Sequence, residues 1–260
     1  MNNKEKISRE RQFIVVKANK MIQDARFDFS LQEQKVIAYL ISKIKPDDSE
    51  MAEQEFNIKE FCQICGIDDN NGKNYADLKK TIQSLADKSI WIKIESEKKE
   101  TLFRWIDKAS IVEQSGIITL KLSDDIKPFL LQLREKFTQY GLIYTLPMRS
   151  QYSIRIYEIL KSYENMHKKN FIVDELKKRL MCENKSYENF SNFRKYVVDI
   201  AISEINEFTD IFVDYTNSKT GRKVTHIEFS ITSKRDSAEK IRTLNKIEAL
   251  LNSPNERIGV

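Results

Sequence analysis

The sequence predicts an α+β protein in which one order of elements, three helices and then a β-hairpin, occurs twice along the chain. Its 260 residues suffice for two domains of roughly 100 to 150 residues each. Hydrophobic residues make up 40% of the chain and charged residues 32%, whereas glycine occupies six positions and proline four. This composition is typical of compact domains built largely from helices with one polar face.

The first half begins with a predicted helix over residues 31–44. Val36, Tyr39 and Ile44 return to one face of this helix, and Ser30 directly before it is a suitable N-cap. The elements expected after it are helices over 58–65 and 75–86, strands over 90–94, 102–106 and 117–122, and a helix over 124–137. Three helices followed by a twisted hairpin is the order of the winged-helix fold.

The same order returns in the second half. It consists of helices over 149–163, 171–182 and 187–208, and of strands over 211–215 and 224–229 around a turn at 218–221. We therefore expect two tandem winged-helix domains. Their predicted limits are an N-terminal arm and strand over 1–28, domain 1 over 29–138, a linker over 139–148, domain 2 over 149–234 and a C-terminal tail helix over 235–260.

An internal duplication supports this organisation. Adding 115 to the residue number superposes the halves without a gap, and apolar positions then coincide. The matched pairs are Phe56 with Phe171, Ile58 with Val173, Phe61 with Leu176, Tyr75 with Phe190, Leu78 with Phe193, Ile82 with Val197, Leu85 with Ile200 and Ala86 with Ala201. Identity in this register is low, so chance helical periodicity is the alternative. The basic pair Lys79-Lys80 also falls on Arg194-Lys195, which favours a duplication.

The third helix of the second half carries the main candidate DNA-binding surface. At about 100° per residue, its apolar side chains share one arc, which is expected to face the core. That arc consists of Phe190, Phe193, Val197, Ile200 and Ala201. Ser191, Asn192 and Lys195 then point outward, and Arg194 lies at the edge. The major groove of B-DNA accommodates one helix, and polar and basic side chains of this kind read its base edges.

The hairpin after this helix is basic at its end. Lys219, Arg222 and Lys223 lie at and after the turn, where a wing contacts phosphate beside the groove. The alternative is that the helix and the hairpin merely present an ordinary solvated surface. The succession of a polar helix face and a basic hairpin favours DNA binding.

The first half offers a weaker version of the same surface. Its candidates are Lys73, Asn74, Lys79 and Lys80. Asp77 is also predicted to point outward, and the preceding loop contains Asp68 and Asp69. Since carboxylates repel phosphate, this half is expected to bind DNA more weakly or mainly through the backbone.

Charge and targeting signals limit the class of protein. Lys and Arg exceed Asp and Glu by 44 to 39, giving a net charge of +5, which by itself is too small to establish a polyanionic partner. The first dozen residues lack the apolar core of a secretory signal, and no run approaches the roughly 18 apolar residues that span a bilayer. A cytoplasmic protein without a membrane partner is expected. The odd number of cysteines, three, indicates reduced thiols.

No motif for metal, nucleotide or nucleophilic chemistry is complete. Residues 66–73 have five residues between their glycines where a phosphate loop has four, and Asn74 replaces its Ser or Thr. Cys62 and Cys65 have the spacing of a zinc knuckle, but zinc takes about four ligands. The other potential ligands are distant in sequence: Cys182, His167 and His226. The two histidines are 59 residues apart, unlike the paired His of a nicking nuclease. We therefore expect no cofactor, no metal and no catalytic residues, hence a binding protein rather than an enzyme.

Three stretches of the sequence resemble a known family. They are FSLQEQK at 29–35, RSQYSIRIYEIL at 149–160, and FRKYVV at 193–198 with Ala201 and Glu204-Ile205-Asn206. On these residues the chain is similar to the replication initiator (Rep) proteins of theta-replicating plasmids with iterons, and particularly to the RepB-like initiators of low-GC Gram-positive bacteria. The likeness extends over about residues 13 to 233.

The resemblance implies two winged-helix domains, of which the C-terminal one makes the main contacts with directly repeated origin sites. In this sequence the corresponding helix carries Ser191, Asn192, Arg194 and Lys195. The resemblance also implies that monomers initiate replication, that dimers formed through the N-terminal domain repress the initiator's own promoter, and that the host initiator and replicative helicase are recruited. The tail after Lys234 lies outside the likeness, and it could pack on its own domain or on a partner.

Two other functions remain open at this point. A winged-helix transcriptional repressor would use the same domains but would bind an inverted repeat as a dimer. An origin-nicking nuclease would cleave supercoiled DNA in the presence of a metal ion.

Overall fold

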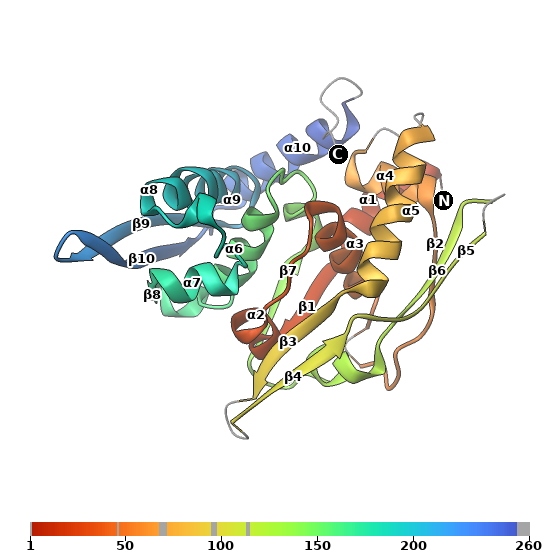
Figure 1. Ribbon diagram of the computed structural model, residues 1–260. Helices are drawn as coiled ribbons and strands as arrows, with labels where there is room; N and C mark the ends of the chain where they lie inside the picture. The colour runs from red at the N-terminus through yellow and green to blue at the C-terminus, as the bar shows by residue number, and fades with distance from the viewer. Residues whose placement is uncertain (1, 46, 68–71, 95–97, 113–114, 254–260) are drawn as a thin grey trace.

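The computed structural model describes residues 2–45, 47–67, 72–94, 98–112 and 115–253. Two winged-helix halves lie side by side, and the last helix runs along both of them (Figure 1). None of the described helices is long and apolar enough to cross a membrane.

The helices predicted over 31–44, 58–65 and 75–86 are present in the first half, whereas residues 1–28, predicted as an arm and a strand, also contain two helices. The elements from Asn3 to Asp87 are α1 (Asn3–Arg11), β1 (Ile14–Ala18), α2 (Asn19–Asp24), α3 (Leu31–Ser42), β2 (Gln54–Asn57), α4 (Ile58–Cys65) and α5 (Gly72–Asp87). Helices α3, α4 and α5 are the three helices of the first winged-helix domain. Helix α3 begins with a capping box. The backbone N–H of Glu33 donates to the Ser30 hydroxyl, and the Glu33 carboxylate accepts from the Ser30 N–H.

The strands of the first half differ from the prediction. Between residues 88 and 123 the described part of the chain forms four strands instead of three: β3 (Ser89–Ile94), β4 (Lys99–Arg104), β5 (Ile106–Val112) and β6 (Ile117–Leu122). The predicted strand over 102–106 is divided at Trp105, which turns into the core against Phe27 and Phe29. Strands β3 and β4 form a two-stranded sheet, and Trp91 of β3 also bridges to Arg26, whereas β6 lies between β2 and β5. The wing of the first half is therefore β5–β6.

The helix predicted over 124–137 is absent. Residues Asp124–Phe129 form a 3-10 helix (η2) that contains Pro128, and Phe137–Gly141 form strand β7, which pairs with β1. Proline has no N–H to continue an α-helical ladder. The alternating burial of Thr138 and Tyr140 is that of a strand. The apolar residues from Ile126 to Leu131 imitate helical periodicity but fill the core from an irregular turn.

The second half follows its prediction more closely. Its elements are α6 (Gln151–Lys161), η4 (Glu164–Met166), β8 (Lys168–Ile172), α7 (Val173–Arg179), η5 (Lys185–Tyr187), α8 (Phe190–Phe193), a π turn η6 (Arg194–Val198), α9 (Asp199–Phe208), β9 (Ile211–Thr220), β10 (Lys223–Ser233) and α10 (Ser237–Asn252). The predicted helix over 171–182 is shorter, because its first residues belong to strand β8. The hairpin β9–β10 is longer than predicted.

The two halves share one topology. Strand order β8-β10-β9 repeats β2-β6-β5, and Phe171 opposite Ile227 repeats Phe56 opposite Ile118. The shift of 115 residues thus holds for the first strand and the second helix. In the hairpin the shift between the halves becomes 109 residues, because Ile118 of β6 corresponds to Ile227 of β10. The pair β3–β4 has no counterpart in the second half.

Helix α6 is anchored to the first half by a buried charge network. The Glu158 carboxylate lies 2.5 Å from Lys17 Nζ and 3.7 Å from an Arg155 nitrogen, and the Tyr140 hydroxyl donates to it. Burial alone would raise the pKa of Glu158, but the two cations and the hydrogen bonds outweigh it and leave that pKa lowered. The segment 139–148, predicted as a linker, contributes Tyr140 to this network and is mostly buried.

Candidate nucleic-acid interface

The third helix of the second half presents a polar and basic face to solvent. Asn189 caps its first turn by accepting the backbone N–H of Ser191 at 2.8 Å. Its core-facing side is formed by Phe193, Val197, Val198, Ala201 and Ile205. The four residues predicted to bind DNA on this helix are all exposed: Ser191, Asn192, Arg194 and Lys195. Their exposure agrees with the helical wheel, while their contact with DNA stays a prediction.

A π turn makes the structure differ from the helical-wheel prediction after Arg194. Ile200 was expected in the buried arc but is 38% exposed, and Val198 is buried instead. The π turn at Arg194–Val198 inserts one residue relative to an α-helix, which rotates the following residues by about 100°. Tyr196, 48% exposed, therefore joins Ile200 on the outer side of the helix.

The same turn places a carboxylate beside Arg194. Asp199 Oδ2 lies 3.7 Å from Arg194 Nε, and Asp199 Oδ1 accepts the hydroxyl of Tyr215 on strand β9. Burial, together with this hydrogen bond, raises the pKa of Tyr215 to about 12. Residues five apart are about 140° apart around an α-helix, so sequence periodicity did not pair these two. The pair links the helix to the base of the wing.

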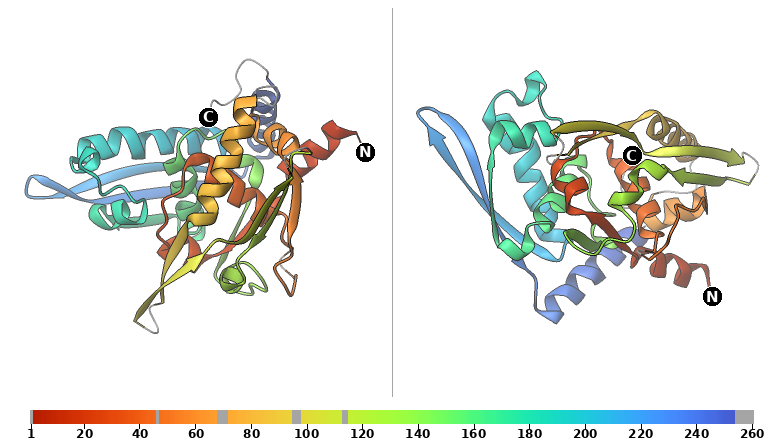
Figure 2. Two further views of the ribbon diagram at one scale, coloured as in Figure 1. Left: turned by 45° about the vertical axis from the view of Figure 1, so that its right-hand side comes forward. Right: turned by 90° about the horizontal axis from the view of Figure 1, so that it is seen from below.

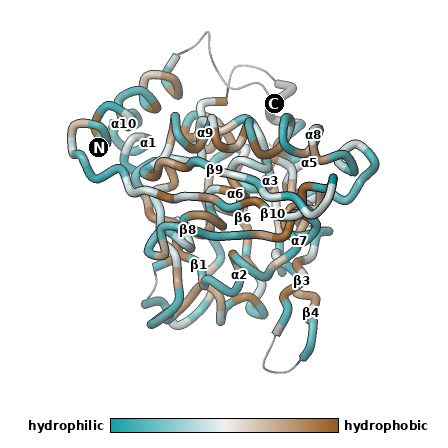
Figure 3. Tube along the Cα trace, turned by 90° about the vertical axis from the view of Figure 1, so that its left-hand side faces the viewer, coloured by the Kyte–Doolittle hydropathy of each residue, from teal (hydrophilic) through white to brown (hydrophobic). Residues whose placement is uncertain are grey.

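The wing extends from the side of the molecule on which the helix begins. Strands β9 and β10 project beyond α8 in every view (Figures 1 and 2), and Figure 3 looks onto this side, with α9 alongside the β8-β10-β9 sheet. Gly221, with φ +62°, and Arg222 form the two-residue turn, a geometry that favours glycine. Lys219 and Arg222 are exposed at the tip. Lys223, behind it, lies 2.9 Å from Asp174 of α7.

The predicted DNA-binding residues of the first half lie on its third helix, α5. Lys80 is exposed and Lys79 is half-buried and interacts with another group, and the contact of either with DNA stays a prediction. The side chains of Lys73 and Asn74 lie outside the described part of the chain. Asp77, predicted to point outward, is half-buried. Among the described side chains of α5, Lys80 is thus the basic candidate that is exposed.

Both lysines in the wing of the first half are paired with carboxylates, whereas in the wing of the second half Lys223 is paired and Lys219 and Arg222 are exposed at the tip. Lys108 on β5 lies 2.8 Å from Glu53, and Lys121 on β6 lies 2.6 Å from Asp124. These lysines are engaged by carboxylates within the domain. A major role of the second half in DNA binding is consistent with this difference.

An exposed polar helix followed by a basic hairpin in the second half, on a topology that the first half shares, defines a tandem winged-helix protein of the nucleic-acid-binding class. The chain belongs to the plasmid-type replication initiator (Rep) family. The family model described as "Initiator Replication protein, WH1" matches residues 14–161, and "Initiator Rep protein, WH2" matches residues 172–231. The first match includes α6, which the sequence pattern assigned to the second domain, and the exact domain limits stay a prediction.

Individual relatives agree with this assignment. A "Replication initiation protein" of Escherichia coli is 27% identical over 228 residues, covering 84% of this chain and 70% of that protein. The "PI protein" of Escherichia coli is 34% identical over 138 residues, covering 46% of this chain and 45% of that protein. The crystal structure of the Pi initiator protein in complex with iteron DNA has the same fold. It matches with a TM-score of 0.71 and 21% identity, covering 87% of this chain and 99% of that one.

Proposed function

We propose that this protein initiates plasmid replication by binding directly repeated sites in double-stranded origin DNA. In this proposal helix α8 and the π turn enter the major groove, with Ser191, Asn192, Arg194 and Lys195 facing the bases and backbone. Lys219, Arg222 and Lys223 of the wing contact the adjacent phosphates. The single observation that carries the proposal is the exposure of all four helix residues beside a projecting basic hairpin.

The first half contributes supporting contacts through Lys80, with Lys73, Asn74 and Lys79 as the other candidates. Its paired wing lysines favour a secondary role. By analogy with the Pi initiator, whose structure contains iteron DNA, both halves would contact the same duplex. Recruitment of the host initiator and helicase, a monomer–dimer balance, autorepression by the dimer and a cytoplasmic location belong to the same proposal.

The test is a gel-shift titration on tandem repeats from the origin. The variant Arg194→Ala with Lys195→Ala is expected to bind more weakly, and the slope of log K against log salt should fall by about 0.9 per lost phosphate contact. Lys240→Ala with Arg242→Ala is the matched control, since both are exposed on α10 and the same charge is removed. Equal affinity and slope in the two double variants would refute the site.

Two further assays separate the alternatives. Footprinting should show protection of direct repeats; a single protected palindrome would instead support a dedicated repressor. We also propose binding without strand cleavage, so supercoiled origin DNA incubated with the pure protein and a divalent metal should stay intact. Nicked product would contradict this.

A further inference from the structure

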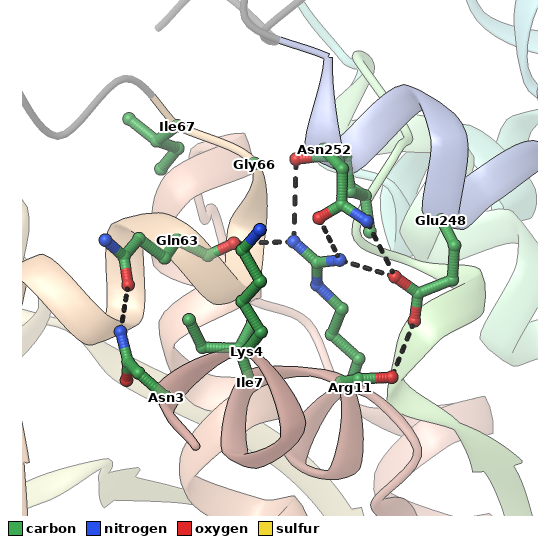
Figure 4. A pocket seen from close by; sticks show the side chains of 11 residues that line it. Asn3, Lys4, Ile7, Arg11, Gln63, Gly66, Ile67, Glu248 and Asn252 are labelled. Atoms are coloured by element: carbon green, nitrogen blue, oxygen red, sulfur yellow. Dashed lines mark hydrogen bonds and ion pairs between the residues drawn. The ribbon is translucent and has the colours of Figure 1, made fainter.

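The first and last helices of the described residues, α1 and α10, meet each other on the first winged-helix domain. Helix α1 precedes the first family match and α10 follows the second, so both lie outside the ranges that the two family models match. They are joined at Arg11, whose side chain is 2% exposed. Figure 4 shows this guanidinium between α1, the end of α4 and the last turn of α10.

The Arg11 guanidinium donates to acceptors on both α10 and α4. From α10, Glu248 lies 2.5 Å from Nη1, and the side-chain oxygen of Asn252 accepts from Nη1 at 3.0 Å. From α4, the carbonyls of Gln63 and Ile64 accept from Nη2 at 2.7 Å and from Nε at 3.0 Å. Burying a guanidinium without such acceptors would cost free energy. Arg11 therefore holds α10 and α4 in positions where their acceptors reach it.

Apolar packing holds α10 in the same place. Ile247 and Leu251, four residues apart, are buried on its inner face. Leu251 lies directly over Gly66, the left-handed residue that ends α4, and a Cβ at position 66 would come within 2.8 Å of its side chain. This close approach requires glycine on the first domain.

The middle of α10 is attached to the second domain. Lys246 Nζ lies 2.7 Å from Glu207 of α9 and 6.0 Å from the ring centre of Phe208. One helix of 16 residues, Ser237–Asn252, therefore contacts α9 of the second half and α1 and α4 of the first.

We propose that α1 and α10 form a terminal clasp, centred on Arg11, that holds the two winged-helix domains in one relative position for binding a single DNA duplex. Arg11 acts here as a positioning residue and does not touch DNA. The effect on DNA rests on the proposed function: a fixed second domain binds at a higher effective concentration than a loosely attached one. The existence of the clasp does not rest on it.

The test compares two full-length variants with the same chemical change on the same helix. Leu251→Asp places a charge under the clasp, whereas Ile241→Asp changes a side chain that is 56% exposed. By hydrogen exchange, Leu251→Asp should accelerate the amides of α10 and α1 by about tenfold or more while β10 stays protected. Ile241→Asp should exchange like the wild type. Equal exchange of α10 in both variants would overturn the clasp.

Affinity then tests positioning. Leu251→Asp should bind tandem-repeat DNA about tenfold more weakly than Ile241→Asp. Unchanged affinity despite faster exchange of α10 would overturn the positioning role. Arg11→Lys serves if Leu251→Asp does not fold, because it keeps the charge but has three donors instead of the five-donor fork; it should also accelerate α10 exchange and lower affinity. Failure of Arg194→Ala with Lys195→Ala to weaken binding would refute the proposed function, while the exchange results would stand.

Discussion

Replacing Asp199 by Asn is expected to lower base discrimination more than overall affinity. Asp199 is a carboxylate on a face predicted to meet phosphate, which makes it unfavourable unless it orients another group. In the structure it holds Arg194 at 3.7 Å and accepts the Tyr215 hydroxyl. Asparagine keeps an oxygen for Tyr215 but loses the charge that orients the guanidinium.

The size of the effect follows from the exposure of the pair. The side chains of Arg194 and Asp199 are 51% and 46% exposed, and an ion pair in such a setting is worth up to about 1 kcal/mol. That energy corresponds to about a fivefold change in an equilibrium constant. Removing one negative charge also strengthens binding to any duplex. The ratio of specific to non-specific affinity should therefore fall by about fivefold, with non-specific affinity unchanged or higher.

Competition binding between the tandem repeat and a duplex of scrambled sequence measures this ratio. Asp214→Asn is the matched control, because Asp214 is an exposed carboxylate beside Tyr215 on β9 and its loss changes the net charge equally. The reasoning is refuted if Asp199→Asn and Asp214→Asn give the same ratio while Arg194→Ala lowers it.

Three further predictions concern stability. Glu158→Gln leaves the buried Lys17 and Arg155 without their shared anion and should cost about 3 to 5 kcal/mol in urea unfolding at pH 7. Because the pKa of Glu158 is lowered on folding, the wild type's advantage is present above the unfolded pKa and should shrink as the pH falls through the folded value. Burial lowers the pKa of Lys35 to about 8, so Lys35→Met should raise the free energy of unfolding at pH 7 by about 3 kcal/mol. For the wild type, that free energy should rise between about pH 8 and the unfolded pKa of lysine. If the free energy of unfolding rises neither with the substitution nor with pH, the burial of this lysine is contradicted. Gly221→Val, at φ +62°, should lower the thermal midpoint and wing-dependent DNA affinity together, and a change in neither would show that the turn tolerates a side chain.

The features that the sequence predicted well are those that depend on neighbours along the chain. The outward direction of Ser191, Asn192 and Lys195 follows from helical periodicity over a few residues, and the Ser30 cap follows from its position before an apolar helix. Even here one local event was invisible, since the π turn that exposes Ile200 leaves no mark in the apolar pattern. Only the structure shows that Val198 is buried in its place.

What the tertiary structure alone decided depends on partners far apart in sequence. Strand β1 pairs with β7 across more than a hundred residues, and the wing of the first half proved to be β5–β6 because only β6 aligns with β2. Arg11 meets Glu248 237 residues away. Periodicity reports which face of an element is buried but not what covers it. The sequence by itself thus determined two winged-helix topologies and a polar, basic helix face on the second, whereas long-range burial and strand pairing decided how α1 and α10 contact the two domains.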